Sequence, residues 1–464
     1  MSDLTERRLS RRQVLQLSLA AVGAAALASC SAPSSPSAPA GTQAPAQSAG
    51  GKPTVSIWNS PSFNETADKA IGDVFKEWGD KNNVAIDYQI ISGTGSELKN
   101  KVTAAIEAKT PPEILFVLSG EAQYYRSQDA LQDITDVITS VKDLEGGMYE
   151  AALVSVGFQG KYYAVPFTVN PWVMHARDDL LKAAGVSYPK TWEEMISISD
   201  KVSKAPQIYT FAFTLGDDND TSYNFLPLAW THGGALQNEQ GALTFKSPGM
   251  VDALKTVKQM WDKKLIPPGA VTWDSSGNNN AFQKGQAVFA YNPNSIYAAV
   301  EAAAKGANAT QQDKDLFANT GMYALPAGPK GSFDEIDVRG FASFKGAKNP
   351  AAAKEALKYL VQPAGYAKII ETGLNRWAPV YKNMMSRPQW QQPAYKDYKH
   401  LMEVGKTIAH AGPPNAAFEE VITTWIIPRM LQDVVNGGKD PEKAMNEAYD
   451  KMVEVYKKWK QPIA

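Results

Sequence analysis

Two arginines are the side chains best suited to hold an anionic small molecule. Arg339 lies in an apolar, strand-like run, and Arg376 lies in a loop-like stretch before a proline. A guanidinium can bind a carboxylate or a phosphate through two parallel hydrogen bonds. An exposed ion pair explains either arginine equally well, so both interpretations stay open.

Aromatic residues are the second group that could recognise a ligand. The chain contains 11 Trp and 19 Tyr, and aromatic ring faces suit the apolar faces of pyranose rings. For each tryptophan alone, packing in a core is at least as good an explanation as stacking. We expect at least one of four candidates to stack on a ligand: Trp172, Trp230, Trp273 or Trp377.

Patterns typical of enzymes are weak. The only cysteine is Cys30, and neither an HExxH motif nor a G-x-S-x-G elbow is present. Carboxylates near 119–121, 143–145 and 217–220 could imitate a glycosidase pair, but a sequence does not give the separation that such a pair needs. The four histidines form no His-x-His pattern: His175, His232, His400 and His410.

Two further motifs invite a site and fall short of one. The turn 92–95 (SGTG) lacks the spacing and the Lys-Ser ending of a nucleotide-binding loop. We therefore interpret it as a helix-capping turn. Asp217, Asp218 and Asp220 lack the closing glutamate of an EF-hand, so we interpret them as a solvated turn rather than a calcium site.

Length and charge bound the function further. With 464 residues the chain can form two or more domains, and its net charge of −1 gives no bias toward nucleic acid or an anionic surface. Residues 1–30 are typical of an export signal, with a basic start, an apolar run too short to span a membrane and a twin-arginine-like motif at 10–15. Leu27–Cys30 looks like a lipobox, which predicts a lipid attached to Cys30. The Ser-, Ala- and Pro-rich residues 31–52 then predict a disordered tether.

The first elements after the tether alternate between strand and helix. Strands are predicted at 54–58, 84–91 and 114–118, with helices between them that begin at a Ser62–Glu65 capping box and at Ser96. This order is typical of a parallel sheet, in which ligands bind beyond the carboxyl ends of the strands. The loops there supply four candidate ligand residues: Ser62, Phe63, Ser119 and Gly120.

The stretch 160–194 organises the rest of the chain. Residues 162–169 predict a buried strand in which Pro166 marks an end, an edge or a bulge. Residues 178–184 predict a short helix, and Thr191 to Glu194 predict a capping box. Later strands are expected at 208–215, 287–291 and 336–344, and later helices at 250–264, 299–308, 350–360 and from Asp440–Pro441 onward.

These segments resemble one protein family. GKYYAVPFTVNP (160–171), DDLLKAAGV (178–186) and PKTWEE (189–194) keep the order found in extracellular solute-binding proteins of ABC importers, family 1, the carbohydrate-binding group. YNFLPLAWTHGG (223–234), residues 282–295 and LPAGPKG (325–331) are also similar to that family.

The resemblance implies an α/β fold of the type II periplasmic-binding-protein class, with two lobes, an interlobe ligand cleft and hinge crossings. It places the crossings near 166–170, 335–341 and 385–395. The first lobe would contain 54–166 with 342–388, and the second 170–336 with 392–464.

The resemblance also implies ligand-binding positions. Asn170 falls just after the crossing strand and Tyr223 on a ligand-facing aromatic position, while Arg339 and Gly340 fall near the cleft. The family often has a stacking aromatic where this chain has Asn294 and Ser295, so the chain departs from the pattern there. Asn292 starts the same segment.

The function implied is capture of a sugar or oligosaccharide by a monomer, which delivers it to a permease and an ATPase, with no cofactor or metal. An alternative ligand is an anionic glycerophosphodiester or uronate held by Arg339 or Arg376. Alternatives of other classes are an exported polysaccharide-degrading enzyme and a structural cell-surface protein without a small ligand.

Overall fold

The computed structural model describes residues 52–62, 64–91, 96–118, 120–373 and 376–464. The export signal, Cys30 and the predicted tether lie outside these residues, as do Phe63, Ser119 and the 92–95 turn. Among the described residues, no helix is long and apolar enough to cross a membrane.

The first lobe is built on a parallel sheet, as the sequence predicts. Strands β1 (Thr54–Asn59), β2 (Ala85–Ile90) and β3 (Ile114–Val117) lie in the order β2-β1-β3. Helices α2 (Glu65–Asn82) and α3 (Ser96–Glu107) connect them. The predicted cap of α2 is wrong by two residues, because Asn64 and not Ser62 accepts the hydrogen bond from Ala67 N.

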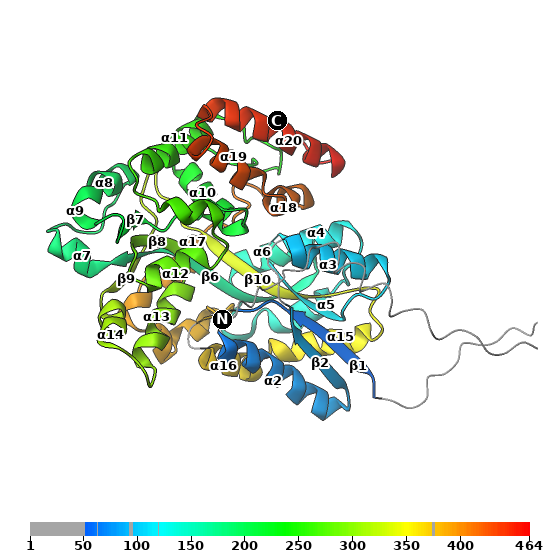
Figure 1. The fold of residues 1–464 in the computed structure, drawn as a ribbon. Helices are drawn as coiled ribbons and strands as arrows, with labels where there is room; N and C mark the ends of the chain where they lie inside the picture. Colours follow the sequence, from blue (N-terminus) through cyan, green and yellow to red (C-terminus); the bar gives the residue numbers. More distant parts are fainter. Residues whose placement is uncertain (1–51, 63, 92–95, 119, 374–375) are drawn as a thin grey trace, which may run out of the picture. The chain divides into compact units, whose positions relative to one another are not determined.

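One long strand joins the two lobes (Figure 1). Strand β6 (Ala164–Arg177) is buried along nearly all of its length. Its first half pairs antiparallel with β10 (Ile336–Ser343). Its second half pairs with β8 (Ala287–Pro293) and β9 (Thr320–Tyr323), and β7 (Tyr209–Phe211) extends the sheet beyond β8. The same sheet therefore runs through both lobes.

Proline is accommodated inside β6 by a bulge. Pro166 lies opposite Gly340, and the pairing register shifts between Arg339 and Gly340. A Cβ atom on Gly340 would lie 2.4 Å from the carbonyl oxygen of Val165, so only glycine allows the two backbones to approach so closely. The bulge interpretation of Pro166 is thus confirmed, although the strand is central rather than at an edge.

Helices cover the sheet and fill the second lobe (Figure 1). Several helices match the predicted ranges closely, but the helix expected at 299–308 starts at Ser295. Strand β7 is shorter than the strand predicted at 208–215. The Thr191 hydroxyl caps α8 as predicted, whereas the Glu194 carboxylate accepts from Lys190 N instead of the cap N–H. The helices after β3 are α4 (Glu121–Ser127), α5 (Thr135–Val141), α6 (Glu150–Val156), α7 (Asp178–Ala183), α8 (Trp192–Ser197), α9 (Ser199–Val202), α10 (Asn219–Thr231), α11 (Pro248–Asp262), α12 (Gly277–Gln283), α13 (Ser295–Lys305), α14 (Gln311–Ala318), α15 (Pro350–Leu360), α16 (Pro363–Thr372), α17 (Tyr398–Val404), α18 (Ala416–Thr423), α19 (Ile426–Val435) and α20 (Pro441–Lys458).

Two large hydrophobic cores are centred on the two lobes, and the first also reaches Val173, Tyr297 and Met322 of the second lobe. One core joins residues of β1, α2 and β10 with Trp390, Tyr398 and Met402, while the other joins the second half of β6 with Ile408 and residues of α18 to α20. The segment before Ile408 thus packs with both lobes, since Tyr395 meets the Tyr297 ring and the Tyr398 hydroxyl donates to Met322 Sδ, and the third crossing at 385–395 stays a prediction.

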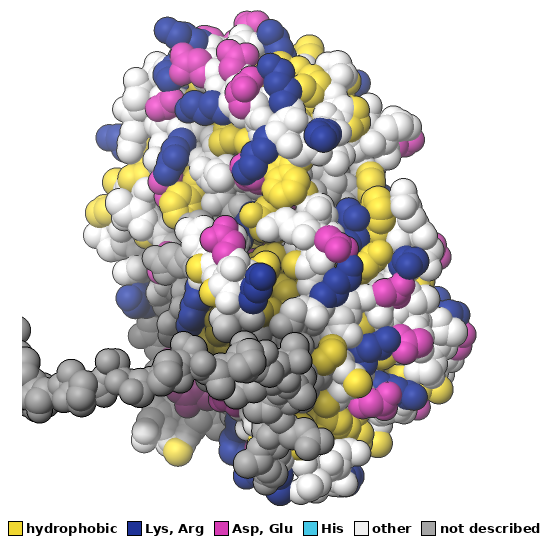
Figure 2. Space-filling view, turned by 90° about the vertical axis from the view of Figure 1, so that its right-hand side faces the viewer, with side chains coloured by type: hydrophobic (Ala, Val, Ile, Leu, Met, Phe, Trp, Pro, Cys, Tyr) yellow, Lys and Arg dark blue, Asp and Glu magenta, His cyan; other side chains and the backbone are white. Residues whose placement is uncertain are grey.

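Charged side chains are mixed on the surface. Figure 2 shows lysine, arginine, aspartate and glutamate interspersed over one face, without a large area of a single sign. This distribution agrees with the net charge of −1 and gives no electrostatic footprint for a polyanion on that face.

The two lobes also touch away from the crossing strands. Lys99 Nζ of α3 donates to Thr423 Oγ1 of α18 at 2.7 Å. The rings of Tyr124 and Trp459 meet edge to face, with centroids 5.4 Å apart. Glu419 of α18 is buried beside Gly120, where an added Cβ would meet its carboxylate. This contact, between α3–α4 and α18–α20, brings carboxylates and a lysine out of water together.

We expect the α4–α18 contact to make stability depend on pH through Glu419. Burial raises the pKa of Glu419 to about 8, Lys99 opposes that shift and Glu121 adds to it. The folded state therefore binds a proton that the unfolded chain releases above about pH 4.3, and stability falls as pH rises toward 8. Urea unfolding at pH 5 to 8 should show a smaller decline for Glu419→Gln than for the unchanged protein.

The matched control is Glu107→Gln, an exposed glutamate on α3. Its pH dependence should follow that of the unchanged protein. An identical decline in Glu419→Gln would contradict the proposed proton uptake at the α4–α18 contact.

Candidate functional site

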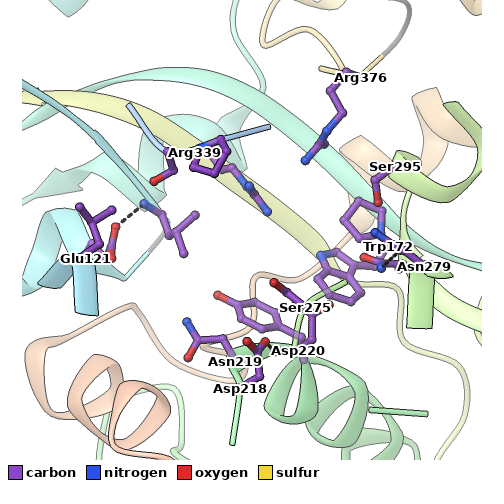
Figure 3. Close-up of a pocket in the computed structure, with 17 residues that line it drawn as sticks. Glu121, Trp172, Asp218, Asn219, Asp220, Ser275, Asn279, Ser295, Arg339 and Arg376 are labelled. Carbon is purple, nitrogen blue, oxygen red and sulfur yellow. Dashed lines mark hydrogen bonds between the residues drawn. The ribbon is translucent and has the colours of Figure 1, made fainter. Parts of the chain in front are cut away.

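A pocket lies where the crossing strands meet loops and helix starts of both lobes (Figure 3). Its cavity volume is about 110 Å³. It is lined by Ser60, Pro61, Leu98, Leu118, Glu121, Trp172, Asp218, Asn219, Asp220, Tyr223, Ser275, Asn279, Asn292, Pro293, Ser295, Arg339 and Arg376.

Two guanidinium groups point into the pocket from one side (Figure 3). Arg339 comes from β10, and its Nε donates to the Asp337 carboxylate. Arg376 follows α16, and its Nε donates to the carbonyl oxygen of Ser62 at 2.7 Å. The Arg376 guanidinium also lies over the Trp377 ring, 4.3 Å from its centre. This wall therefore offers hydrogen-bond donors to a ligand.

The opposite wall is formed by the start of α10 (Figure 3). Asp218 is the N-cap residue, and its Oδ1 accepts from Asp220 N at 2.9 Å. Burial raises the pKa of Asp218, and repulsion from Asp274 adds to that shift. Burial also raises the pKa of Asp220 well above its usual range, and repulsion from Asp218 adds to it. These carboxyls can accept hydrogen bonds from ligand hydroxyls, and in their protonated form they can also donate.

A stacked aromatic pair lies between the two walls. Trp172 and Tyr223 are nearly parallel, with an interplanar angle of 6° and centroids 5.3 Å apart. Trp172 directly follows the crossing half of β6, and its backbone N–H donates to Glu335 O at 2.8 Å. The indole N–H of Trp172 is buried without a hydrogen-bond partner among the described residues. The pair gives the pocket a flat apolar surface next to its polar groups.

Amide and hydroxyl groups complete the second-lobe side. Asn292 at the end of β8 donates to Asn279 Oδ1 of α12 at 2.5 Å and to Asn278 Oδ1 at 3.2 Å. Ser295 begins α13, where the first backbone N–H groups of a helix have no partner within the helix. The Asn292 amide and the Ser295 hydroxyl can both donate to and accept from ligand hydroxyls, whereas the backbone N–H groups can only donate.

Glu121 contributes the pocket's third carboxyl. It begins α4, and its Oε2 accepts from Leu118 N at 2.9 Å. Burial raises the pKa of Glu121, while the Leu118 N–H and Lys99 oppose that shift. Glu121 thus links the pocket to the α4–α18 contact. Among the described residues, no group of three or more His, Cys, Asp or Glu side chains is arranged to hold a metal ion.

The structure brings six of the predicted ligand residues together at the pocket: Trp172, Tyr223, Asn292, Ser295, Arg339 and Arg376. Phe63 and Ser119 lie outside the described residues. Eight other candidates lie off the pocket lining: Ser62, Gly120, Asn170, Trp230, Trp273, Asn294, Gly340 and Trp377.

The tryptophans off the lining have packing roles. Trp230 is buried in the second-lobe core beside His410, with ring centroids 5.1 Å apart. Trp377 is buried against Phe116 and Phe167 in the first-lobe core and supports Arg376 from beneath. The Trp273 backbone lies against Gly216, and its side chain packs against Gly277. For these three, the core-packing interpretation describes the structure.

The polar candidates off the lining hold other groups in place. Ser62 gives its carbonyl oxygen to Arg376, and its N–H donates to the Asp68 carboxylate. Gly120 lies against Glu419, and Asn294 is the buried N-cap residue of α13. Asn170 is fully buried, and its Oδ1 accepts from Ala378 N at 2.8 Å and from Thr168 Oγ1 at 3.0 Å. These residues act on the pocket through its lining residues.

The sequence interpretation of the acidic run is wrong. Only Asp217 is exposed, and it pairs with Arg429. Asp218 is 7% exposed, and Asp218, Asn219 and Asp220 line the pocket. An Asp that precedes a helical pattern is a strong N-cap signal, and that signal could have placed Asp218 at a helix start facing the cleft.

Comparison with known proteins agrees with this architecture. Residues 60–367 match the sequence model of the bacterial extracellular solute-binding protein family. A binding protein of Brucella abortus (strain 2308) is 24% identical over 324 residues, which span 68% of this chain and 73% of the relative.

Two solved structures share the fold. Maltose-bound MalE3 of T. maritima has a TM-score of 0.74 at 20% identity, covering 87% of this chain and 99% of its own. A sugar transporter from Arthrobacter chlorophenolicus A6 with bound laminaribiose has a TM-score of 0.75 at 18% identity, with the same coverage of 87% and 99%. These matches confirm the predicted two-lobed fold class.

We expect Asn170 to support the pocket through stability rather than through ligand contact. Asn170→Ala leaves the buried Ala378 N–H without its acceptor, which should lower the free energy of unfolding by about 1–3 kcal/mol. Urea denaturation measures this change. The control Asn308→Ala, at an exposed position, should stay within about 0.5 kcal/mol of the unchanged protein. Equal stability of the two variants would contradict the assignment.

Proposed function

Since the chain belongs to the bacterial extracellular solute-binding protein family, we propose that it captures a sugar or oligosaccharide in the pocket of Figure 3 and delivers it to the permease of an ABC importer. The observation that carries this proposal is the pocket itself. A stacked Trp172–Tyr223 pair lies beside carboxyl, amide and guanidinium groups at the junction of the two lobes.

The chemistry of the lining suits a polyhydroxylated ring. Hydroxyl hydrogens can be accepted by Asp218 and Asp220, and hydroxyl oxygens can accept from Asn292 and Arg339. The apolar face of a ring can rest on the aromatic pair. Maltose and laminaribiose are bound by the two structural neighbours described above, and the same class of ligand is proposed here.

Capture would involve a hinge motion of the lobes. Strands β6 and β10 run between the lobes, and a third crossing is predicted at 385–395, so rotation about few backbone segments would open the cleft. The α4–α18 contact would then form on closure and separate on opening. In this proposal the Glu121 carboxyl links ligand binding to the state of that contact, because it lines the pocket and interacts electrostatically with Lys99.

Export and anchoring complete the proposal. The family is extracellular, and residues 10–15 and 27–30 favour twin-arginine export followed by lipid attachment at Cys30. We propose a monomer held at the outer face of the cytoplasmic membrane, which docks on a permease served by a cytoplasmic ATPase. Two acyl chains on a lipoprotein cysteine would give stable anchoring.

A thermal-shift screen of the purified protein tests the function. The panel contains neutral mono- and disaccharides, including maltose and laminaribiose, with uronates and sugar phosphates. A ligand at 100 times its dissociation constant adds about 2.7 kcal/mol of stability, which is readily seen as a higher melting temperature. We expect a shift with the ligand recovered intact. Recovery of cleaved sugar would indicate an enzyme, and no shift with any compound would overturn the proposal.

Asp218→Asn tests the pocket assignment for whichever sugar binds. Asparagine keeps the cap on α10 but removes the ionisable acceptor, so sugar affinity should fall about five- to tenfold in calorimetric titration while the melting temperature changes little. Asp217→Asn, at the adjacent exposed residue, is the matched control and should bind normally. Equal affinity of both variants would place the ligand elsewhere.

A further inference from the structure

Arg376 carries a buried charge that lacks a carboxylate partner. Its side chain belongs to a residue only 4% exposed, and its Nη1 is buried without a hydrogen-bond partner among the described residues. No described carboxylate lies within 4.0 Å of it. Asp337 and Asp68 attract it only from beyond that distance. Because a buried charge is costly unless it is paired, this guanidinium is poised for an anion that the chain itself does not supply.

A second guanidinium faces the same space (Figure 3). Arg339 is largely buried, and its Nε is paired with Asp337. Burial and then the repulsion from Arg339 lower the pKa of Arg376 to about 9. Arg376 still keeps its charge at neutral pH, so two like charges share one wall with a single carboxylate in contact. An anionic group between them would relieve the repulsion.

The carboxyls that line the pocket do not cancel this charge, neither Asp218 and Asp220 on the opposite wall nor Glu121 at the start of α4. Burial raises the pKa of Asp218, Asp220 and Glu121, which favours their neutral, protonated forms. None of the three forms an ion pair with either arginine among the described residues. The opposite wall, which carries Asp218 and Asp220, is therefore suited to hydroxyl groups. The pocket is divided into a cationic side and a hydroxyl-binding side.

We infer that the ligand is an acidic sugar, whose carboxylate or phosphate group lies between Arg376 and Arg339 and whose hydroxyls meet Asp218 and Asp220. This inference rests on the proposed function, because it assigns a substrate class to the same pocket. A neutral hydroxyl could accept one hydrogen bond from Arg376, but it would leave the buried charge uncompensated. An acid group would accept hydrogen bonds from Arg376 and compensate its charge, and two of its oxygens fit a guanidinium fork.

Calorimetric titration of the purified protein with matched sugars tests the inference. Each set has one stereochemistry and differs only at carbon 6: glucose, glucuronate and glucose 6-phosphate, then galactose, galacturonate and galactose 6-phosphate. Maltose and laminaribiose represent neutral disaccharides. We expect at least one acid to bind about tenfold or more tightly than its neutral partner. A preference for the uronate or for the phosphate would distinguish the two sources of negative charge.

The variant Arg376→Lys tests whether Arg376 recognises the acid group of the ligand. Lysine keeps a positive charge but loses the two-pronged geometry and the stacking over Trp377. The ratio of acid to neutral affinity should shrink by about tenfold. Arg387→Lys, at a half-buried arginine paired with Glu371, should preserve the ratio. Melting curves check that each variant is folded. The comparison of acidic with neutral sugars uses the unchanged protein, so it tests the inference even if a variant does not fold.

The outcomes separate the inference from the proposed function. Binding of a neutral sugar or disaccharide with equal or weaker binding of every acid would overturn the acidic ligand and leave sugar capture standing. An unchanged acid preference in Arg376→Lys would overturn the role of Arg376. Absence of binding by every compound would overturn both the acidic ligand and sugar capture.

Discussion

The antiparallel pairing of β6 with β10 is the interaction on which the rest of the molecule depends. It joins the sheets of both lobes into one ladder. It also places Arg339, Asp337 and Trp172 next to one another at the lobe junction, because their backbones belong to the paired strands. The bulge at Pro166 and Gly340 bends this ladder directly beside the pocket. Bulges commonly re-aim side chains near functional sites, and here the bulge follows immediately after Arg339.

Local patterns predicted most of the fold because their physical cause is local. The alternation of strands and helices through β3 depends on apolar periodicity, and the caps at Thr191 and Asp440 depend on side-chain hydrogen bonds within three residues. Errors arose where neighbours in space competed. Ser62 has the correct spacing for a cap, yet its backbone serves Arg376 and Asp68, and Asn64 caps α2 instead.

The site was predictable only in part, because its members come from segments far apart in the chain. Aromatic residue type identified Trp172 as one of four candidate tryptophans, and the family pattern identified Tyr223, Ser295 and Arg339. Neither signal separates a lining residue from one buried just behind it. Asn170 and Trp377 are examples. Asn170 accepts from Ala378 N, and the Trp377 ring lies beneath the Arg376 guanidinium. Asp218 and Asp220 were missed because a run of aspartates is usually a solvated turn, and only tertiary packing reveals their burial.

Ligand capture and lobe contact use the same buried charges. Glu121 lines the pocket, and its carboxyl is electrostatically coupled to Lys99, which contacts α18. Lys99 in turn opposes the upward shift of the Glu419 pKa. Lys99, Glu121 and Glu419 come from both lobes, are buried together, and influence one another's ionisation. In the proposed hinge motion, separation of the lobes would let water reach these groups and restore their usual charges. A ligand that changes the charge near Glu121 and Arg376 would then change the free energy of closing the lobes, so the electrostatic balance of the pocket would be part of the proposed closing step.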